Sequence, residues 1–122
     1  NNLDLNNLYL DGILSVSAVN EEFFNEINLL SPFGPGNKEP TFVLENMKIV
    51  KSIIVGDKHI KAIMTARNGK SIEAIAFNSK DGILESYLSK SYKKEFHIAG
   101  KIYLNEWRGK RKIEFMINDI AT

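Results

Sequence analysis

The sequence predicts a mainly β fold: a five-stranded barrel with a short helix between its third and fourth strands, preceded by a small αβ segment. All three prolines lie in residues 32–40, and no helix or central strand can run through that segment, because proline fixes φ and removes a backbone donor. After residue 40 the spacing of apolar residues changes from 3.6 to 2, the period of strands. A chain of 122 residues can bury a core without disulfides, and this one has no cysteine.

The part before the prolines predicts a strand and a helix. Residues 8–18 fit one strand, or two short strands broken at the turn-forming pair Asp11–Gly12. Asn20 is expected to cap a helix over residues 21–30. One face of this helix is apolar and carries Phe23, Phe24, Ile27 and Leu30. A unit this small cannot bury itself, so it is either the tail of a preceding domain or a brace packed on the later part of the chain.

Five later segments predict strands: 42–55, 59–67, 71–77, 95–104 and 112–120. The first is long enough to bend and serve two sheets, and Asn68–Gly69 is a strong hairpin signal between the second and third. Residues 83–88 fit one or two helical turns. Gly100 stands in mid-strand, where a barrel needs a tight bend. Residues 105–109 are expected to form a loop around the only tryptophan.

Strand-strand-strand-helix-strand-strand is the order of the OB-fold, a five-stranded Greek-key barrel. SH3-like barrels compete, but the helix after the third strand favours the OB-fold. The predicted organisation is therefore a strand-plus-helix segment over 1–31, a Pro/Gly joint over 32–40 and a barrel over 41–122.

Charge is distributed unevenly along the chain. Residues 1–40 carry one Lys against six Asp or Glu, a net charge of −5, whereas residues 41–122 carry 15 Lys or Arg against nine acidic residues, a net charge of +6. A basic segment suggests a polyanionic partner, although a solvated lysine-rich surface is the alternative. No apolar run approaches the roughly 20 residues that span a bilayer, and the lack of cysteine fits a reducing cytoplasm.

Catalytic motifs are missing from this sequence. His59 and His97 are isolated, and no serine has a nucleophile motif around it. The glycine-rich run 34–37 lacks the Gly-Lys-Ser/Thr ending of a P-loop. The sequence therefore indicates no catalytic residue and no metal ligand.

Binding features are clearer. OB-folds bind single strands over their second and third strands, between the loop joining strands one and two and the loop joining strands four and five. Cations there neutralise phosphates and aromatic rings stack on bases. Phe77 is alternatively a core residue, and Trp107 alternatively a lid on the barrel. The candidate DNA-binding residues are Lys58, His59, Lys61, Arg67, Phe77, Tyr103, Asn105, Trp107, Arg108, Lys110 and Arg111.

Residues 32–40, Pro-Phe-Gly-Pro-Gly-Asn-Lys-Glu-Pro, resemble the Pro-Phe-Gly-x-Gly-Asn-x-Glu-Pro signature of the RecJ family of single-strand-specific exonucleases. The proline usual after the asparagine is Lys38 here. The resemblance continues in residues 58–61, 72–77 and 100–109. It implies that residues 1–31 are the end of a DHHA1 region, that 41–122 are the OB domain after it, and that Phe33 is pinned between them. Asn37 is expected to cap local backbone rather than contact DNA.

The resemblance also implies a function. Enzymes of this family degrade single-stranded DNA from the 5′ end in repair and recombination, using Mn²⁺ or Mg²⁺ held by DHH motifs that this sequence does not contain. We therefore expect a single-stranded-DNA-binding module, without a metal or an activity of its own. Its expected partners are single-stranded DNA, the remaining nuclease domains and a single-strand-binding protein. The alternative is a structural or protein-docking domain.

Overall fold

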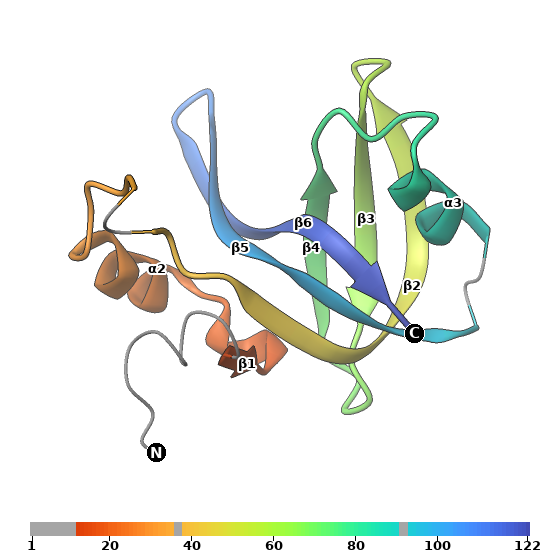
Figure 1. The fold of residues 1–122 in the computed structure, drawn as a ribbon, viewed down its shortest axis with the longest axis horizontal. Helices are drawn as coiled ribbons and strands as arrows, with labels where there is room; N and C mark the ends of the chain where they lie inside the picture. Colours follow the sequence, from red (N-terminus) through yellow and green to blue (C-terminus); the bar gives the residue numbers. More distant parts are fainter. Residues whose placement is uncertain (1–11, 36–37, 91–92) are drawn as a thin grey trace.

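The computed structural model describes residues 12–35, 38–90 and 93–122 (Figure 1). The first part of the predicted strand over 8–18 and the predicted capping by Asn37 lie outside the described residues. The described chain begins with strand β1 (Gly12–Leu14), a 3-10 turn η1 (Val16–Ala18) and helix α2 (Glu21–Asn28). Asn20 caps α2 as predicted, because its side-chain oxygen accepts a hydrogen bond from the Phe23 backbone N–H at 2.9 Å. The helix ends two residues before the predicted end.

Five further strands and one helix follow, namely β2 (Phe42–Val55), β3 (His59–Thr65), β4 (Ser71–Ala76), α3 (Ile83–Lys90), β5 (Glu95–Trp107) and β6 (Lys110–Ala121). The strands pair in the order β2-β3-β4-β6-β5, and β5 pairs back onto β2, so the sheet closes. The β4–β6 pairing is parallel and the other pairings within the barrel are antiparallel. This closed barrel, with α3 between its third and fourth strands, is the predicted OB-fold.

Strand β2 serves both sides of the barrel, as its length predicts. Its first half, Phe42–Lys48, pairs with β5, and its second half, Lys48–Val55, pairs with β3. Register shifts between Leu44 and Met47 and between Ile49 and Lys51 let the strand bend between the two partners.

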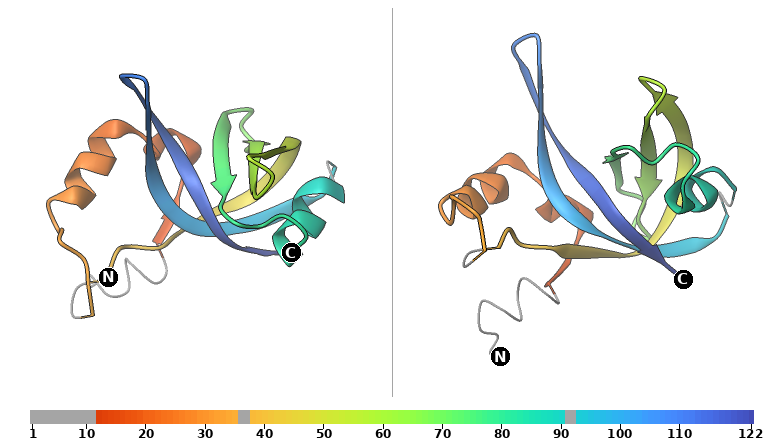
Figure 2. Two further views of the ribbon diagram at one scale, coloured as in Figure 1. Left: turned by 90° about the horizontal axis from the view of Figure 1, so that it is seen from above. Right: turned by 45° about the horizontal axis from the view of Figure 1, so that its top comes forward.

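The N-terminal segment with α2 and helix α3 lie on different sides of the barrel (Figure 2). Helix α3 contributes the fully buried Leu88 to the core. The N-terminal segment contributes the buried Val16, and Phe23 of α2 packs on Phe42 with ring centroids 5.5 Å apart. In addition, β1 pairs in parallel with the start of β2. Residues 12–28 are therefore packed on the barrel. A brace packed on the later part of the chain is one of the two arrangements that the sequence leaves open for this segment.

The predicted loop over residues 105–109 is wrong. Strand β5 continues to Trp107 and β6 begins at Lys110, so the two strands form a long hairpin, here called the β5–β6 arm (residues 103–114). Its turn consists of Arg108 and Gly109, with φ of 50° and 77°. Positive φ at both central residues defines the turn that matches the twist of a two-residue hairpin. The arm, in blue in Figure 1, projects from the barrel.

Gly100 occupies a close contact between β5 and β6. The β5–β6 register shifts between Ala99 and Gly100. A Cβ atom at position 100 would overlap the backbone carbonyl of Met116 and lie 2.9 Å from the ring of Phe115. Only glycine lets the two backbones approach this closely.

Candidate nucleic-acid interface

The candidate interface is the outer face of β3 and β4, between the β2–β3 turn and the β5–β6 arm (Figure 1). Strand alternation creates this face. Ile60, Ala62 and Met64 are buried in the barrel core, which places His59 and Lys61 of β3 on the opposite side. The face therefore carries polar and aromatic groups over a fully packed core.

Three of the predicted residues form an aromatic row. The ring centroid of Phe77 lies 5.1 Å from that of His59 and 5.3 Å from that of Tyr103, both in edge-to-face geometry. The His59 Nδ1 atom accepts a hydrogen bond from the Asn78 backbone N–H at 2.9 Å, which fixes the ring. Phe77 is 37% exposed, so it is not a core residue. The row thus offers an ordered aromatic surface to solvent.

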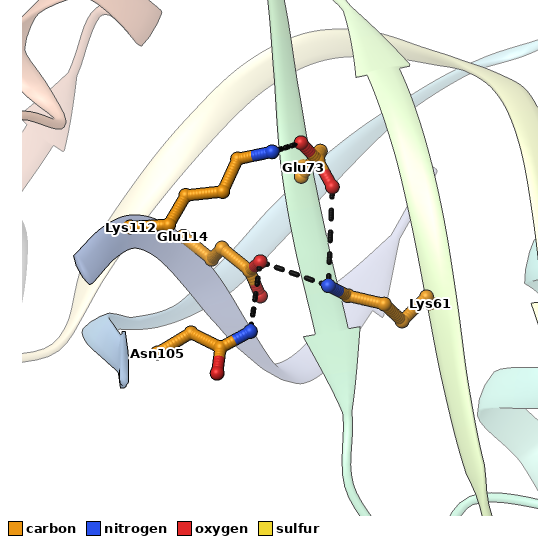
Figure 3. Close-up of polar contacts among 5 residues, drawn as sticks. All are labelled: Lys61, Glu73, Asn105, Lys112 and Glu114. Atoms are coloured by element: carbon orange, nitrogen blue, oxygen red, sulfur yellow. Dashed lines mark hydrogen bonds and ion pairs between the residues drawn. The ribbon is translucent and has the colours of Figure 1, made fainter. Parts of the chain in front are cut away.

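Two other predicted residues, Lys61 and Asn105, belong to a polar network beside this row (Figure 3). Both donate to Oε2 of Glu114, Lys61 Nζ at 2.8 Å and Asn105 Nδ2 at 3.2 Å. Lys61 also lies 3.8 Å from Glu73, which pairs in turn with Lys112. The Glu114 side chain is 1% exposed, and its Oε1 atom has no hydrogen-bond partner. Lys61 and Asn105 are therefore held in place by a buried carboxylate.

Trp107 and Arg108 lie at the tip of the β5–β6 arm. Trp107 is 64% exposed, so it does not close the barrel. The Arg108 guanidinium lies over the Trp107 ring, 4.5 Å from its centroid, in a cation–π contact. Lys110 is exposed beside them, and Lys58 is exposed in the β2–β3 turn. These groups flank the aromatic row on its two sides.

The two remaining predicted cations are held by carboxylates. Arg111 donates to Glu21 at 3.1 Å and to Glu106 at 3.2 Å, and the hydrogen bond to Glu21 is the main cause that raises the pKa of Arg111. Arg67 follows the far end of β3 from His59 and binds Glu95 with both Nε and Nη2. That pairing lowers the pKa of Glu95, chiefly through the hydrogen bond from Arg67. The structure therefore does not bring Arg67 to the aromatic row.

Three residues of this face were absent from the predicted set: Glu73, Lys112 and Glu114. A signal for Glu114 existed, since it stands between the apolar residues Ile113 and Phe115 on a predicted strand, and alternation places it on the outer face. Its pairing with Lys61 spans 53 residues and depends on the register of β4 with β6, which the sequence does not reveal.

The described residues do not offer a metal site. Among residues 12–35, 38–90 and 93–122, no group of three or more His, Cys, Asp or Glu side chains is arranged to hold an ion. The Mn²⁺ or Mg²⁺ that the family resemblance implies therefore does not fit this part of the chain. Within the same residues, neither helix is long and apolar enough to cross a membrane.

The fold and this face define an OB-fold domain with a flanked aromatic surface that extends from β3, past the end of β4, to β5. Comparison with known proteins identifies the family. The family model described as the RecJ OB domain matches residues 10–119. The chain belongs to this family.

Two curated relatives illustrate the match. The single-stranded-DNA-specific exonuclease RecJ of Bacillus subtilis (strain 168) is 33% identical over 115 residues, which cover 92% of this chain and 14% of that protein. The exonuclease RecJ of Escherichia coli (strain K12) is 26% identical over 111 residues, covering 90% of this chain and 18% of that protein. This chain therefore spans less than a fifth of the length of either relative.

Solved structures show the same fold. RecJ of Thermus thermophilus in complex with Mn²⁺ superimposes with a TM-score of 0.58 and 25% identity, covering 81% of this chain and 13% of that one. The complex of the same protein with Mg²⁺ gives a TM-score of 0.60 at 20% identity, covering 89% of this chain and 15% of that one.

Proposed function

We propose that this chain is the single-stranded-DNA-binding OB module of a RecJ-like 5′–3′ exonuclease of DNA repair and recombination, and that it grips the strand beside the catalytic core. The observation that carries the proposal is the row His59–Phe77–Tyr103, which is ordered and partly exposed. Stacking of a base on an aromatic side chain contributes about 1–3 kcal/mol and tolerates any sequence. Family membership supports the same function, because the relatives are named single-stranded-DNA-specific exonucleases.

Cations on both sides of the row supply the second part of the grip. Lys58 in the β2–β3 turn and Arg108 and Lys110 at the arm tip flank the row, at the two loops that border the ligand face of OB-folds. Each phosphate that they neutralise releases counterions, which makes the affinity dependent on salt. In this proposal the rings hold the bases and the flanking cations hold the backbone.

Hydrolysis belongs, in this proposal, to the rest of the parent protein. The described residues hold no group of three or more His, Cys, Asp or Glu side chains arranged for a metal ion, whereas the RecJ of Thermus thermophilus was solved with Mn²⁺ and with Mg²⁺. We further propose that residues 1–31 end a DHHA1-type domain, that 32–40 form the joint, and that the OB domain occupies 41–122. Residues 12–28 would then belong to the first domain in sequence while bracing the barrel of the second.

Fluorescence anisotropy with a labelled mixed-sequence oligonucleotide tests the binding. We expect binding at low salt, weaker binding at higher salt, and preference for the single strand over its duplex. Phe77→Ala should weaken binding by about tenfold to a hundredfold, because it removes the centre of the row. Ile83→Ala is the matched control, since Ile83 is an exposed apolar residue of α3 that does not belong to the row. Absence of binding at low salt, or equal affinity of the two variants, would refute the proposal.

A second candidate function is a docking domain that braces the nuclease core or binds a partner such as a single-strand-binding protein. On the outer face beside Lys61, Ile53 of β2 and Ile63 of β3 are exposed apolar side chains that line one shallow hollow. Exposed apolar side chains that lie together fit a protein contact. Mixing this chain with the separately purified remaining domains, or with a single-strand-binding protein, should then give a complex that Ile53→Ser weakens. A complex indifferent to Ile53→Ser would exclude this surface.

A further inference from the structure

A buried acceptor without a donor lies on the candidate interface. Phe115 is fully buried in the barrel core and Ile113 packs against it, so Glu114 between them lies on the outer face. Both donors near the carboxylate, Lys61 Nζ and Asn105 Nδ2, contact Oε2. Oε1 is buried and has no hydrogen-bond partner. Buried polar atoms are nearly always hydrogen-bonded, and an unmade bond to a charged group is costly, so a donor from a bound molecule would be favoured at this atom.

The unpartnered oxygen belongs to a residue next to the aromatic row. Glu114 and Tyr103 are direct partners across the β5–β6 pairing. The Tyr103 ring contacts Phe77, which contacts His59. A base that stacks on Tyr103 would therefore lie next to the residue that carries the unpartnered oxygen, and the hydrogen-bonding groups of a base lie on its edge.

One lysine side chain beside the carboxylate can yield to DNA. Lys112 precedes Glu114 by two residues on the same face of β6 and pairs with Glu73, and its side chain is 56% exposed. Lys61, in contrast, stays with the buried Glu114. A phosphate can compete with Glu73 for the ammonium group of Lys112, which ends a long flexible stem. Movement of Lys112 toward the DNA backbone would uncover the outer face beside Glu114.

We propose that Glu114 Oε1 reads bases in the single-stranded-DNA site by accepting a hydrogen bond from an exocyclic amino group. Cytosine, adenine and guanine carry such a group, whereas thymine has a carbonyl oxygen where cytosine has its amino group, and its remaining donor is the ring N3–H. A contact at the exocyclic position therefore favours cytosine over thymine. This inference rests on the proposed function, because it concerns the same site.

Homopolymeric oligonucleotides of equal length test the preference at neutral pH by anisotropy. Oligo(dC) should bind about tenfold more tightly than oligo(dT), as expected for one hydrogen bond to a charged group. Replacing cytosine with 2-pyrimidinone, which lacks only the amino group, should reduce the affinity to that of oligo(dT). This substitution retains the pyrimidine ring, so it separates hydrogen bonding from stacking.

Glu114→Gln gives a sharper test, because the network dictates how the new amide lies. Lys61 and Asn105 both donate to the Oε2 position, so the amide oxygen lies there and the NH₂ group takes the Oε1 position. A donor then faces the base in place of the acceptor, so the preference for oligo(dC) over oligo(dT) should be lost. Glu22→Gln is the matched control; it removes a charge from an exposed residue of α2 and should leave the preference unchanged.

The outcomes separate the two proposals. Failure to bind any oligonucleotide would overturn the DNA-binding function and base reading together. Binding with equal affinity for oligo(dC), its 2-pyrimidinone analogue and oligo(dT) would overturn base reading alone. If Glu114→Gln fails to fold by circular dichroism, the comparison of cytosine with 2-pyrimidinone on the unsubstituted protein still decides the question.

Discussion

Replacing Lys61 with methionine should destabilise the fold far more than an ordinary surface substitution. The Lys61 side chain is 28% exposed, but its partner Glu114 is 1% exposed. The substitution keeps an unbranched side chain of nearly the same length and removes its charge. It therefore leaves a carboxylate that has already lost its water without the cation that compensates for that loss.

The expected loss of stability follows from the geometry. Two unit charges 2.8 Å apart attract by about 6 kcal/mol at an effective dielectric constant near 20, and the cost of burying Glu114 offsets a large part of this. Removing one partner of a buried pair costs about 3–5 kcal/mol. We expect the lower end, about 3 kcal/mol, because Asn105 continues to donate to Glu114. Replacing Glu114 with leucine in the Lys61→Met variant should recover most of the lost stability, because the buried carboxylate that required a cation is then gone.

Urea unfolding followed by far-ultraviolet circular dichroism measures these changes. Lys80→Met is the matched control. Lys80 pairs with Asp57 at 2.7 Å, a distance similar to that of the Lys61 pair, but Asp57 is 86% exposed. An exposed pair of this kind contributes about 0–1 kcal/mol. If Lys61→Met costs no more than Lys80→Met, Glu114 is hydrated in solution and the reasoning fails.

Three further predictions concern other parts of the molecule. Gly100→Ala should lower the free energy of unfolding in urea by about 3 kcal/mol or more, because the added Cβ atom overlaps the backbone of β6. Gly34→Ala should change it little, because open space surrounds that position. Equal losses in the two variants would contradict the close contact at Gly100. Arg67→Ala should lower the melting temperature at neutral pH but not in acid. Arg67 lowers the pKa of Glu95, so the pair stabilises the fold above the ordinary pKa of about 4.5, and this stabilisation is lost as the pH falls through the lowered pKa. Thermal melts across this pH range measure the difference, and a loss of stability that persists in acid would refute the prediction. Arg108→Ala should weaken DNA binding and reduce the slope of log K against log salt by about 0.7 if Arg108 contacts one phosphate; an unchanged slope would remove it from the interface.

The barrel could be predicted because its signals are local. Asn68–Gly69 specifies a hairpin, and Ile60, Ala62 and Met64 mark the core face of β3 by simple alternation. The β5–β6 arm could not be predicted in the same way. Its turn begins with Arg108 rather than the usual Asn or Asp, and its outer part projects from the barrel and has no apolar side to show the strand period.

For the candidate site, the sequence predicts only which side chains point outward from each strand. Alternation places His59 and Lys61 outward, and the structure agrees. Which groups they meet depends on pairings between distant strands. Lys61 meets Glu114 from 53 residues away, and Arg67 meets Glu95 from 28 residues away. Several predicted DNA ligands therefore already have carboxylate partners, which a linear pattern of charges cannot reveal.

The two-residue turn of the β5–β6 arm determines which side chains of β5 and β6 lie opposite each other on the interface. With Arg108 and Gly109 as the turn, Trp107 pairs with Lys110 and, four residues further down the strand, Tyr103 pairs with Glu114. One residue added to either strand would move every later side chain of that strand to the opposite face. The length of this turn, rather than the identity of its residues alone, thus keeps Tyr103 and Glu114 side by side on the face that carries Phe77.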